Sequence, residues 1–183
     1  MINEKEITRL SKFISLVLRH KPETIGLSLD KNGWAQTAVL IEKMNKKGLP
    51  ITHELLDYLV ATNPKKRFSF NEDKTRIRAN QGHSIEIDLQ LMPVHPPAVL
   101  YHGTDVHSIA SILQSGLEKR QRQHVHLSPD IETAVTVGKR HGKPAVLIVE
   151  AASMFSDGFE FYLSDNGVWL TEHVPAKYLQ QVR

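Results

Sequence analysis

The sequence predicts an α+β protein made of two lobes, and three observations carry this prediction. The first 93 residues contain three segments with the apolar spacing of amphipathic helices, followed by two alternating segments typical of a β-hairpin. Residues 94–183 instead contain short strand-like segments between small helices. Between these patterns lies MPVHPPA (92–98), whose three prolines favour a stiff, extended connector. We therefore expect one domain at residues 1–93 and another at residues 94–183.

Three helices and a hairpin are expected in the first domain. Asn3 and Glu6 resemble a capping box ahead of an apolar stripe, the second helix covers residues 37–47, and the third starts at Thr52. The segments RFSF and TRIRA then alternate around the turn residues NEDK. Three helices followed by a hairpin predict a winged-helix lobe. On this wing Arg67 would lie on the face opposite the inward-facing phenylalanines.

The second domain is expected to combine short strands with small helices. Residues 105–113 have the pattern of an amphipathic helix, and Ser128-Pro129-Asp130 predicts another helix start, with Ser128 as the cap. The expected strands are residues 98–101, 124–128 and 144–150, followed by a hairpin over Asn166-Gly167.

Composition excludes several classes of protein. The chain has no Cys, so disulfides, thiolate nucleophiles and Cys-bound zinc are ruled out. No apolar run reaches ~18 residues, and the N-terminus lacks the apolar region of a signal peptide. We therefore expect a cytoplasmic protein without a membrane span.

The charge is unevenly distributed, although the net charge is only +3. Residues 65–78 contain six basic residues and two acidic ones. Such a cluster predicts a polyanionic partner, with nucleic acid as the first candidate. The alternative is a charged sheet edge that protects against aggregation.

Arginine and histidine residues are the main indication of a functional site. The chain has neither a GxGxxG nor a Walker phosphate loop, and His124 with His126 lack a clear third zinc ligand, so we expect no metal. Arg19-His20 ends a helix, Arg67 opens the wing, and Arg122 precedes a strand. Guanidinium groups bind phosphate through a bidentate fork. Converging arginines with a histidine therefore predict a site for a phosphate monoester or its transfer.

Six segments together resemble the RNA 2′-phosphotransferase family. They occur in the order typical of the family and span nearly the whole chain: LSKFISLVLRHKP (10–22), KKRF (65–68), RANQGHS (78–84), LYHGT (100–104), RQHVHLS (122–128) and NGVWLTEHVP (166–175). The resemblance implies a winged-helix lobe followed by an ADP-ribosyltransferase-like lobe. It also implies a substrate RNA carrying a 2′-phosphate, NAD⁺ as co-substrate and a cytoplasmic role in tRNA splicing or RNA repair.

The implied reaction has two steps. The RNA 2′-phosphate attacks the nicotinamide ribose and expels nicotinamide, and the ribose O2″ then attacks phosphorus. This releases RNA with a 2′-OH and ADP-ribose 1″,2″-cyclic phosphate. The resemblance places the catalytic set at Arg19, His20, Arg67 and Arg122, with Arg78 as second choice for the role of Arg67. Because these residues come from both halves, it predicts a site between the lobes.

The resemblance assigns further residues to the substrates. The residues that the resemblance implies for NAD⁺ binding are His102, Gly103, Thr104, His126 and Ser128. Gly103 would let the backbone approach the ribose and nicotinamide. No base is needed for the first step, because phosphate is already an anionic nucleophile. The second step needs proton transfer, and His20 is the candidate. Contacts with phosphate or ribose oxygens are expected from Arg78, Gln81, His83 and Ser84, and the alternative is a polar brace between domains.

Two other functions remain open. His102-Gly103-Thr104 and His126-Leu127-Ser128 each match the HxT/HxS pattern of 2H phosphoesterases, which act on cyclic phosphates. A winged-helix nucleic-acid binder without catalysis is the other alternative, and ADP-ribosylation of RNA ends is a related activity. We expect a monomer, because each lobe can bury its own apolar faces.

Overall fold

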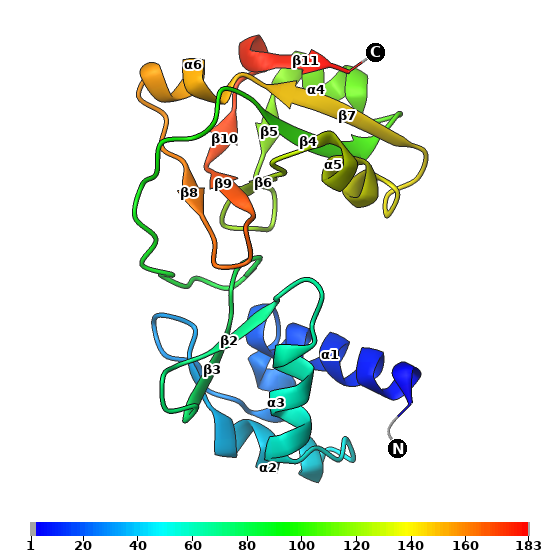
Figure 1. Ribbon diagram of the computed structural model, residues 1–183, viewed down its shortest axis with the longest axis vertical. Coiled ribbons are helices and arrows are strands. Elements are labelled where there is room, and N and C mark those ends of the chain that lie inside the picture. The colour runs from blue at the N-terminus through cyan, green and yellow to red at the C-terminus, as the bar shows by residue number, and fades with distance from the viewer. Residues whose placement is uncertain (1–2, 183) are drawn as a thin grey trace. The chain divides into compact units, whose positions relative to one another are not determined.

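The computed structural model describes residues 3–182, which form two compact units. The first unit ends at Gln90 and the second begins at Leu91, close to the boundary expected after residue 93. Helices and small sheets occur in both units, so the predicted α+β class is confirmed (Figure 1). Along the chain from residue 3 to residue 182, no helix is both long and apolar enough to cross a membrane.

The first unit follows the predicted order of helices and strands. Asn3 caps the first helix by accepting a hydrogen bond from the Glu6 N–H (2.9 Å), and Thr52 caps the third by accepting one from the Leu55 N–H (3.2 Å). These local bonds explain why both helices begin where the sequence predicts. The elements are α1 (Glu4–Arg19), η1 (Pro22–Ile25), β1 (Ala35–Gln36), α2 (Thr37–Lys46), α3 (His53–Ala61), β2 (Phe68–Phe70) and β3 (Arg76–Ala79).

A three-stranded antiparallel sheet, in the order β1-β3-β2, closes the first unit. The hairpin between β2 and β3 was predicted, and Phe68 lies in the core at 3% exposure. The strand β1 was not predicted, because two residues are too few for an alternating pattern. The strand exists through its pairing with β3, where Ala35 lies opposite Ile77. The core beneath this sheet is built mainly from apolar side chains of α1, α2 and α3.

Between Leu91 and residue 182, the second unit contains three small sheets, with strand orders β11-β7-β4, β6-β9-β8 and β10-β5. Its second core lies among these sheets and helices. The elements are β4 (Leu100–Asp105), α4 (Ile109–Ser115), β5 (Leu117–Glu118), β6 (Val125–Leu127), α5 (Ile131–Gly138), β7 (Pro144–Val149), α6 (Ala151–Ser156), β8 (Tyr162–Leu163), β9 (Trp169–Thr171), β10 (His173–Val174), η2 (Ala176–Tyr178) and β11 (Leu179–Gln181).

Close packing of α5 on β4 depends on two glycines (Figure 1). A Cβ atom added at Gly103 would lie 1.7 Å from the carbonyl oxygen of Ala134. A Cβ atom at Gly138 would lie 2.6 Å from the carbonyl oxygen of Thr104. Only glycine fits at these positions, so Gly103 has a packing role in addition to any role in binding.

Two predicted helix starts are wrong. The helix expected from residue 105 begins at Ile109, because the Asp105 carboxylate accepts hydrogen bonds from the N–H groups of His107 and Ser108 and holds a turn. The cap of α5 is Asp130, which accepts from the Thr133 N–H at 2.7 Å. Ser128 cannot cap this helix, because its backbone exchanges two hydrogen bonds with Tyr101.

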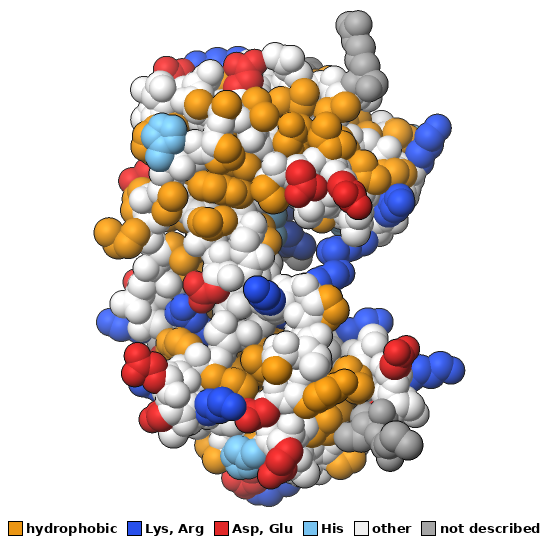
Figure 2. Space-filling view, in the orientation of Figure 1, with side chains coloured by type: hydrophobic (Ala, Val, Ile, Leu, Met, Phe, Trp, Pro, Cys, Tyr) orange, Lys and Arg blue, Asp and Glu red, His pale blue; other side chains and the backbone are white. Residues whose placement is uncertain are grey.

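Charged side chains of both signs are spread over both units. On the face that Figure 2 shows, Lys and Arg lie among Asp and Glu on each unit. The basic segment 65–78 is partly neutralised, because Lys74 pairs with Asp57 at 2.7 Å and Arg76 with Asp30 at 3.6 Å. Surface pairs of this kind contribute little to stability.

Candidate functional site

The C-terminal end of α1 presents the first pair of predicted site residues. Arg19 is the last residue of the helix, and His20 is its C-cap, with an N–H that bonds to the carbonyl oxygen of Leu16 at 2.9 Å. Buried Val17 and Leu18 anchor this last turn in the core. The free carbonyl groups at a helix C-terminus carry partial negative charge and stabilise nearby cations. The helix end therefore suits a cationic pair.

Ser84 joins the segment RANQGHS to the end of α1. Its Oγ and the His20 Nδ1 form a hydrogen bond of 2.9 Å, and its N–H donates to the Arg19 carbonyl at 3.0 Å. The first of these bonds fixes the orientation of the imidazole ring. It also assigns Nδ1 to the protein, so that Nε2 is the ring nitrogen suited to exchange a proton with a substrate.

The strands β2 and β3 position two arginines. The Arg78 guanidinium lies over the Trp34 ring, 4.6 Å from the ring centroid, which is a cation–π contact. The backbone beside Arg67 is held by Asn80, whose N–H donates to the Arg67 carbonyl at 2.9 Å and whose Nδ2 donates to the Lys66 carbonyl at 2.7 Å. Neither Trp34 nor Asn80 was predicted as a site residue: Asn80 lies within RANQGHS but was given no role there, and Trp34 lies outside the six quoted segments.

His83 is packed inside the first unit, with only 1% of its surface exposed. Burial, together with the positive charges of Arg19, His20 and Arg78, lowers its pKa to about 4. His83 is therefore a neutral imidazole at neutral pH. Within residues 3–182 neither of its ring nitrogens has a hydrogen-bond partner. Its predicted contact with phosphate or ribose stays a prediction.

The chain therefore brings most of the first unit's predicted residues to one place. We call Arg19, His20, Arg78, His83 and Ser84 the α1-end cluster, because hydrogen bonds or electrostatic interactions link each of them to another member. The Arg67 carbonyl accepts a hydrogen bond from the Asn80 N–H, which holds the backbone of Arg67 beside the end of β3. Gln81 lies two residues before His83 in the chain, and no hydrogen-bond partner of its buried Oε1 is found among the described residues.

In the second unit, hydrogen bonds connect three of the predicted residues. The His102 Nδ1 donates to the His126 carbonyl at 3.1 Å, and the Arg122 Nη1 donates to the His126 Nδ1 at 2.9 Å. As an acceptor, His126 Nδ1 carries no proton in this arrangement. Burial lowers the pKa of His102 and that of Arg122, the latter with a contribution from Arg140. His102 is therefore favoured in its neutral form.

The remaining residues predicted to bind NAD⁺ are less accessible. Thr104 and Ser128 are each 8% exposed, and Gly103 faces the backbone of α5. The contact that Gly103 was expected to allow with a ribose stays a prediction. Its demonstrated close contact is with α5, which sets the spacing between the strand that carries His102 and the helix beside it.

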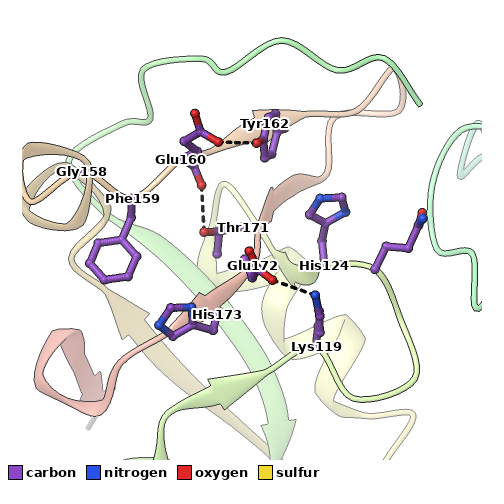
Figure 3. Close-up of a pocket in the computed structure, with 10 residues that line it drawn as sticks. Lys119, His124, Gly158, Phe159, Glu160, Tyr162, Thr171, Glu172 and His173 are labelled. Carbon is purple, nitrogen blue, oxygen red and sulfur yellow. Dashed lines mark hydrogen bonds and ion pairs between the residues drawn. The ribbon is translucent and has the colours of Figure 1, made fainter. Parts of the chain in front are cut away.

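A pocket of about 520 Å³ lies elsewhere in the second unit (Figure 3). Its walls come from residues 119, 123–124, 158–160, 162 and 171–173, and it includes none of the residues predicted for catalysis or NAD⁺ binding. The pocket was not predicted, because its residues come from three separate segments of the chain. In the part of the chain that the structure describes, no group of three or more His, Asp or Glu side chains is placed to hold a metal ion.

Comparison with known proteins identifies the family. Residues 5–173 match the RNA 2′-phosphotransferase, Tpt1/KptA family. A protein of Flavobacterium johnsoniae named "Probable RNA 2′-phosphotransferase" is 57% identical over 179 residues, which cover 98% of each chain. Proteins of the same name from Fusobacterium nucleatum and Agrobacterium fabrum are 57% and 55% identical, over 94% of this chain and 97% and 92% of theirs. The chain belongs to the RNA 2′-phosphotransferase family.

Proposed function

We propose that this protein removes an internal 2′-phosphate from RNA by transferring it to NAD⁺. The single observation that carries the proposal is the α1-end cluster, in which an oriented histidine lies among arginines, in a chain of this family. The products would be RNA with a 2′-OH, nicotinamide and ADP-ribose 1″,2″-cyclic phosphate. Family membership favours this reaction over the 2H-type phosphodiesterase and over a nucleic-acid binder without catalysis.

The two units would then be a winged-helix lobe and an ADP-ribosyltransferase-like lobe. Support for the first is the order of three helices followed by an antiparallel sheet with a β2–β3 hairpin. Support for the second is the linked set of His102, His126 and Arg122, whose neutral imidazoles and guanidinium suit the hydroxyl and phosphate oxygens of a dinucleotide. NAD⁺ would supply the ribose carbon that the phosphate attacks.

The arginines would bind the 2′-phosphate and stabilise charge on its oxygens. Arg19 and Arg78 lie close enough to His83 to lower its pKa, so positive charge gathers around the α1-end cluster. Because the phosphate is already anionic, its attack on the ribose carbon requires no base. These residues would therefore act in the first step by holding and orienting the nucleophile.

His20 would move a proton in the second step. In that step the ribose O2″ loses a proton as it attacks phosphorus, and the RNA 2′-oxygen gains a proton as it leaves. A histidine whose ring is held through Nδ1 can accept the first proton and donate the second through Nε2. General acid–base catalysis of this kind is typically worth ~10²–10⁴-fold.

The activity assay uses RNA with one internal 2′-phosphate, incubated with and without NAD⁺. We expect loss of the phosphate only when NAD⁺ is present. Loss without NAD⁺ would favour a phosphoesterase, and no loss in either case, together with RNA binding, would favour a nucleic-acid binder. The same RNA without the phosphate is the binding control.

The His20→Ala variant separates the two steps. It should slow the second step more than the first, so that RNA-2′-phospho-ADP-ribose accumulates in a single-turnover time course on a gel. If His20 only holds the phosphate, both steps weaken together and no intermediate accumulates. The variants Arg67→Ala and Arg78→Ala identify which arginine contacts the phosphate. The variant that loses this contact should bind phosphorylated RNA with less preference over unphosphorylated RNA.

A further inference from the structure

The pocket of the second unit has a charge pattern that disfavours phosphate. Its ionised groups are one cation, Lys119, and two carboxylates, Glu160 and Glu172. Lys119 pairs with Glu172 at 2.8 Å and lowers the pKa of that carboxyl group. The Tyr162 hydroxyl donates to Glu160 at 2.7 Å, and this bond raises the pKa of Tyr162 to about 12. With a formal charge of −1, the pocket favours a ligand that offers N–H donors over an anion.

Rings line the same pocket. His124 and Tyr162 lie 5.6 Å apart between ring centroids, and Phe159 and His173 lie 5.3 Å apart (Figure 3). Burial lowers the pKa of His124, and Lys119 lowers it further, so a neutral imidazole is favoured there. Tyr, Phe and His side chains are the surfaces on which unstacked RNA bases are bound. The volume of about 520 Å³ is ample for one base and its ribose.

Two residues that line the pocket directly follow a predicted phosphate-binding residue in the chain. Gln123 and His124 line it, and both follow Arg122 in the chain. Consecutive Cα atoms are about 3.8 Å apart, so these residues lie within about two such steps, or roughly one nucleotide length, of Arg122. A nucleotide next to one bound at Arg122 could therefore reach the pocket.

We propose that this pocket binds the base of an RNA nucleotide next to the 2′-phosphate, and that guanine fits it best. This role of the pocket rests on the proposed function. Guanine presents N1–H and N2–H donors side by side, which match the two oxygens of one carboxylate. Glu172 is suited to this role, because its side chain is 76% exposed and its ion pair with Lys119 is weak enough to open. The rings of His124 and Tyr162 would contact one face of the base.

The first test varies the RNA. Single-turnover rates are measured at subsaturating RNA, with oligonucleotides that differ only in the base next to the 2′-phosphate: guanine, adenine, cytosine, uracil or an abasic site. A guanine neighbour should increase the apparent affinity about tenfold over uracil or the abasic site, as one bidentate base contact does. The varied base is placed first on the 5′ side and then on the 3′ side of the phosphate-bearing nucleotide. Equal affinities for all five RNAs at both positions would overturn the proposal.

The second test changes the carboxylate. Glu172→Gln replaces two acceptors by one acceptor and one donor, the pattern that pairs with adenine, so the preference should shift from guanine towards adenine. The matched control is Glu150→Gln, which also loses a side-chain-bonded carboxylate, held by Gln180 at 2.6 Å, but lies outside the pocket. The control should keep the preference for guanine. An unchanged preference in Glu172→Gln would refute the role of Glu172.

Two further measurements test whether the pocket binds NAD⁺ instead of RNA, and whether it binds a base even if the proposed function is wrong. The NAD⁺ concentration dependence is measured for both variants, because adenine of NAD⁺ is another base that the pocket could take. A rise in the NAD⁺ KM of Glu172→Gln without any change in RNA preference would assign the pocket to NAD⁺ and overturn the RNA assignment. Binding of GMP and UMP, followed by NMR shifts of the pocket residues, needs no activity. Shifts with GMP in a protein that leaves the 2′-phosphate intact would refute the proposed function and keep the base pocket.

Discussion

Replacing Ser84 by Ala tests how the segment RANQGHS acts on catalysis. The change removes the 2.9 Å bond to His20 Nδ1 and keeps the backbone bond from Ser84 N–H to the Arg19 carbonyl. A hydrogen bond of this kind contributes about 0.5–1.5 kcal/mol net. At 25 °C this corresponds to about a 2- to 13-fold loss of correctly oriented His20. Because His20 is proposed to move protons in the second step, that step should slow by this factor, and the first step should slow less.

The assay is a single-turnover time course that resolves substrate, ADP-ribosylated intermediate and product. In Ser84→Ala the intermediate should reach a higher peak than in the wild type, and Ser84→Thr, which keeps a hydroxyl, should restore the ratio of the two rates. The matched control is Ser15→Ala, which also loses a hydroxyl on or beside α1, bonded to the Ser11 carbonyl at 2.9 Å. It should leave the ratio unchanged.

One result would refute this reasoning about Ser84. If Ser84 contacts the substrate directly, as the resemblance suggested, Ser84→Ala should raise the KM for RNA and leave the ratio of the two rates at its wild-type value. Thermal unfolding of both variants shows whether either change acts through stability. A lower Tm with an unchanged ratio would assign Ser84 a structural role only.

Three further outcomes are expected. Between pH 6.5 and about 4, His83 takes up a proton in the unfolded chain but not in the folded chain, so the protein loses stability as the pH falls through this window. The difference between the two pKa values corresponds to about 3 kcal/mol of unfolding free energy. In denaturant unfolding, His83→Phe should reduce this pH dependence, and an equal dependence in both proteins would contradict the burial argument. Gly103→Ala should lower the free energy of unfolding by about 3 kcal/mol or more, because the added Cβ would meet the backbone of α5. Gly167→Ala should lower it by about 1 kcal/mol, because its Cβ meets nothing within 4 Å but its φ is +77°. Equal melting temperatures of the two variants would refute this difference. Activity should persist in excess EDTA, since the charge at the α1-end cluster comes from arginine, and full loss that added Zn²⁺ or Mg²⁺ restores would contradict the mechanism.

The sequence by itself determined the features that depend on neighbouring residues. The cap at Asn3, the alternation on either side of the β2–β3 turn and the buried strand β7 were all predicted, because caps, turns and periodicity act over a few residues. The family resemblance also came from the sequence, since its motifs are contiguous segments. Where a local signal competed with tertiary pairing, the prediction was wrong, as at Ser128, whose bonds to Tyr101 outweighed its capping tendency.

Only the tertiary structure decided which polar residues meet. Ser84 and His20 are 64 positions apart in the chain, and no spacing rule predicts that their side chains bond. The burial of His83 and the cation–π contact of Arg78 with Trp34 likewise depend on how distant segments pack. The sequence of a polar motif does not show whether its side chains face solvent or the core. The pocket at residues 119, 123–124, 158–160, 162 and 171–173 is also a product of strand pairing between separate segments. Pairing and packing of this kind are set by the whole core, so the local pattern of residues could name candidates for the site but could not bring them together.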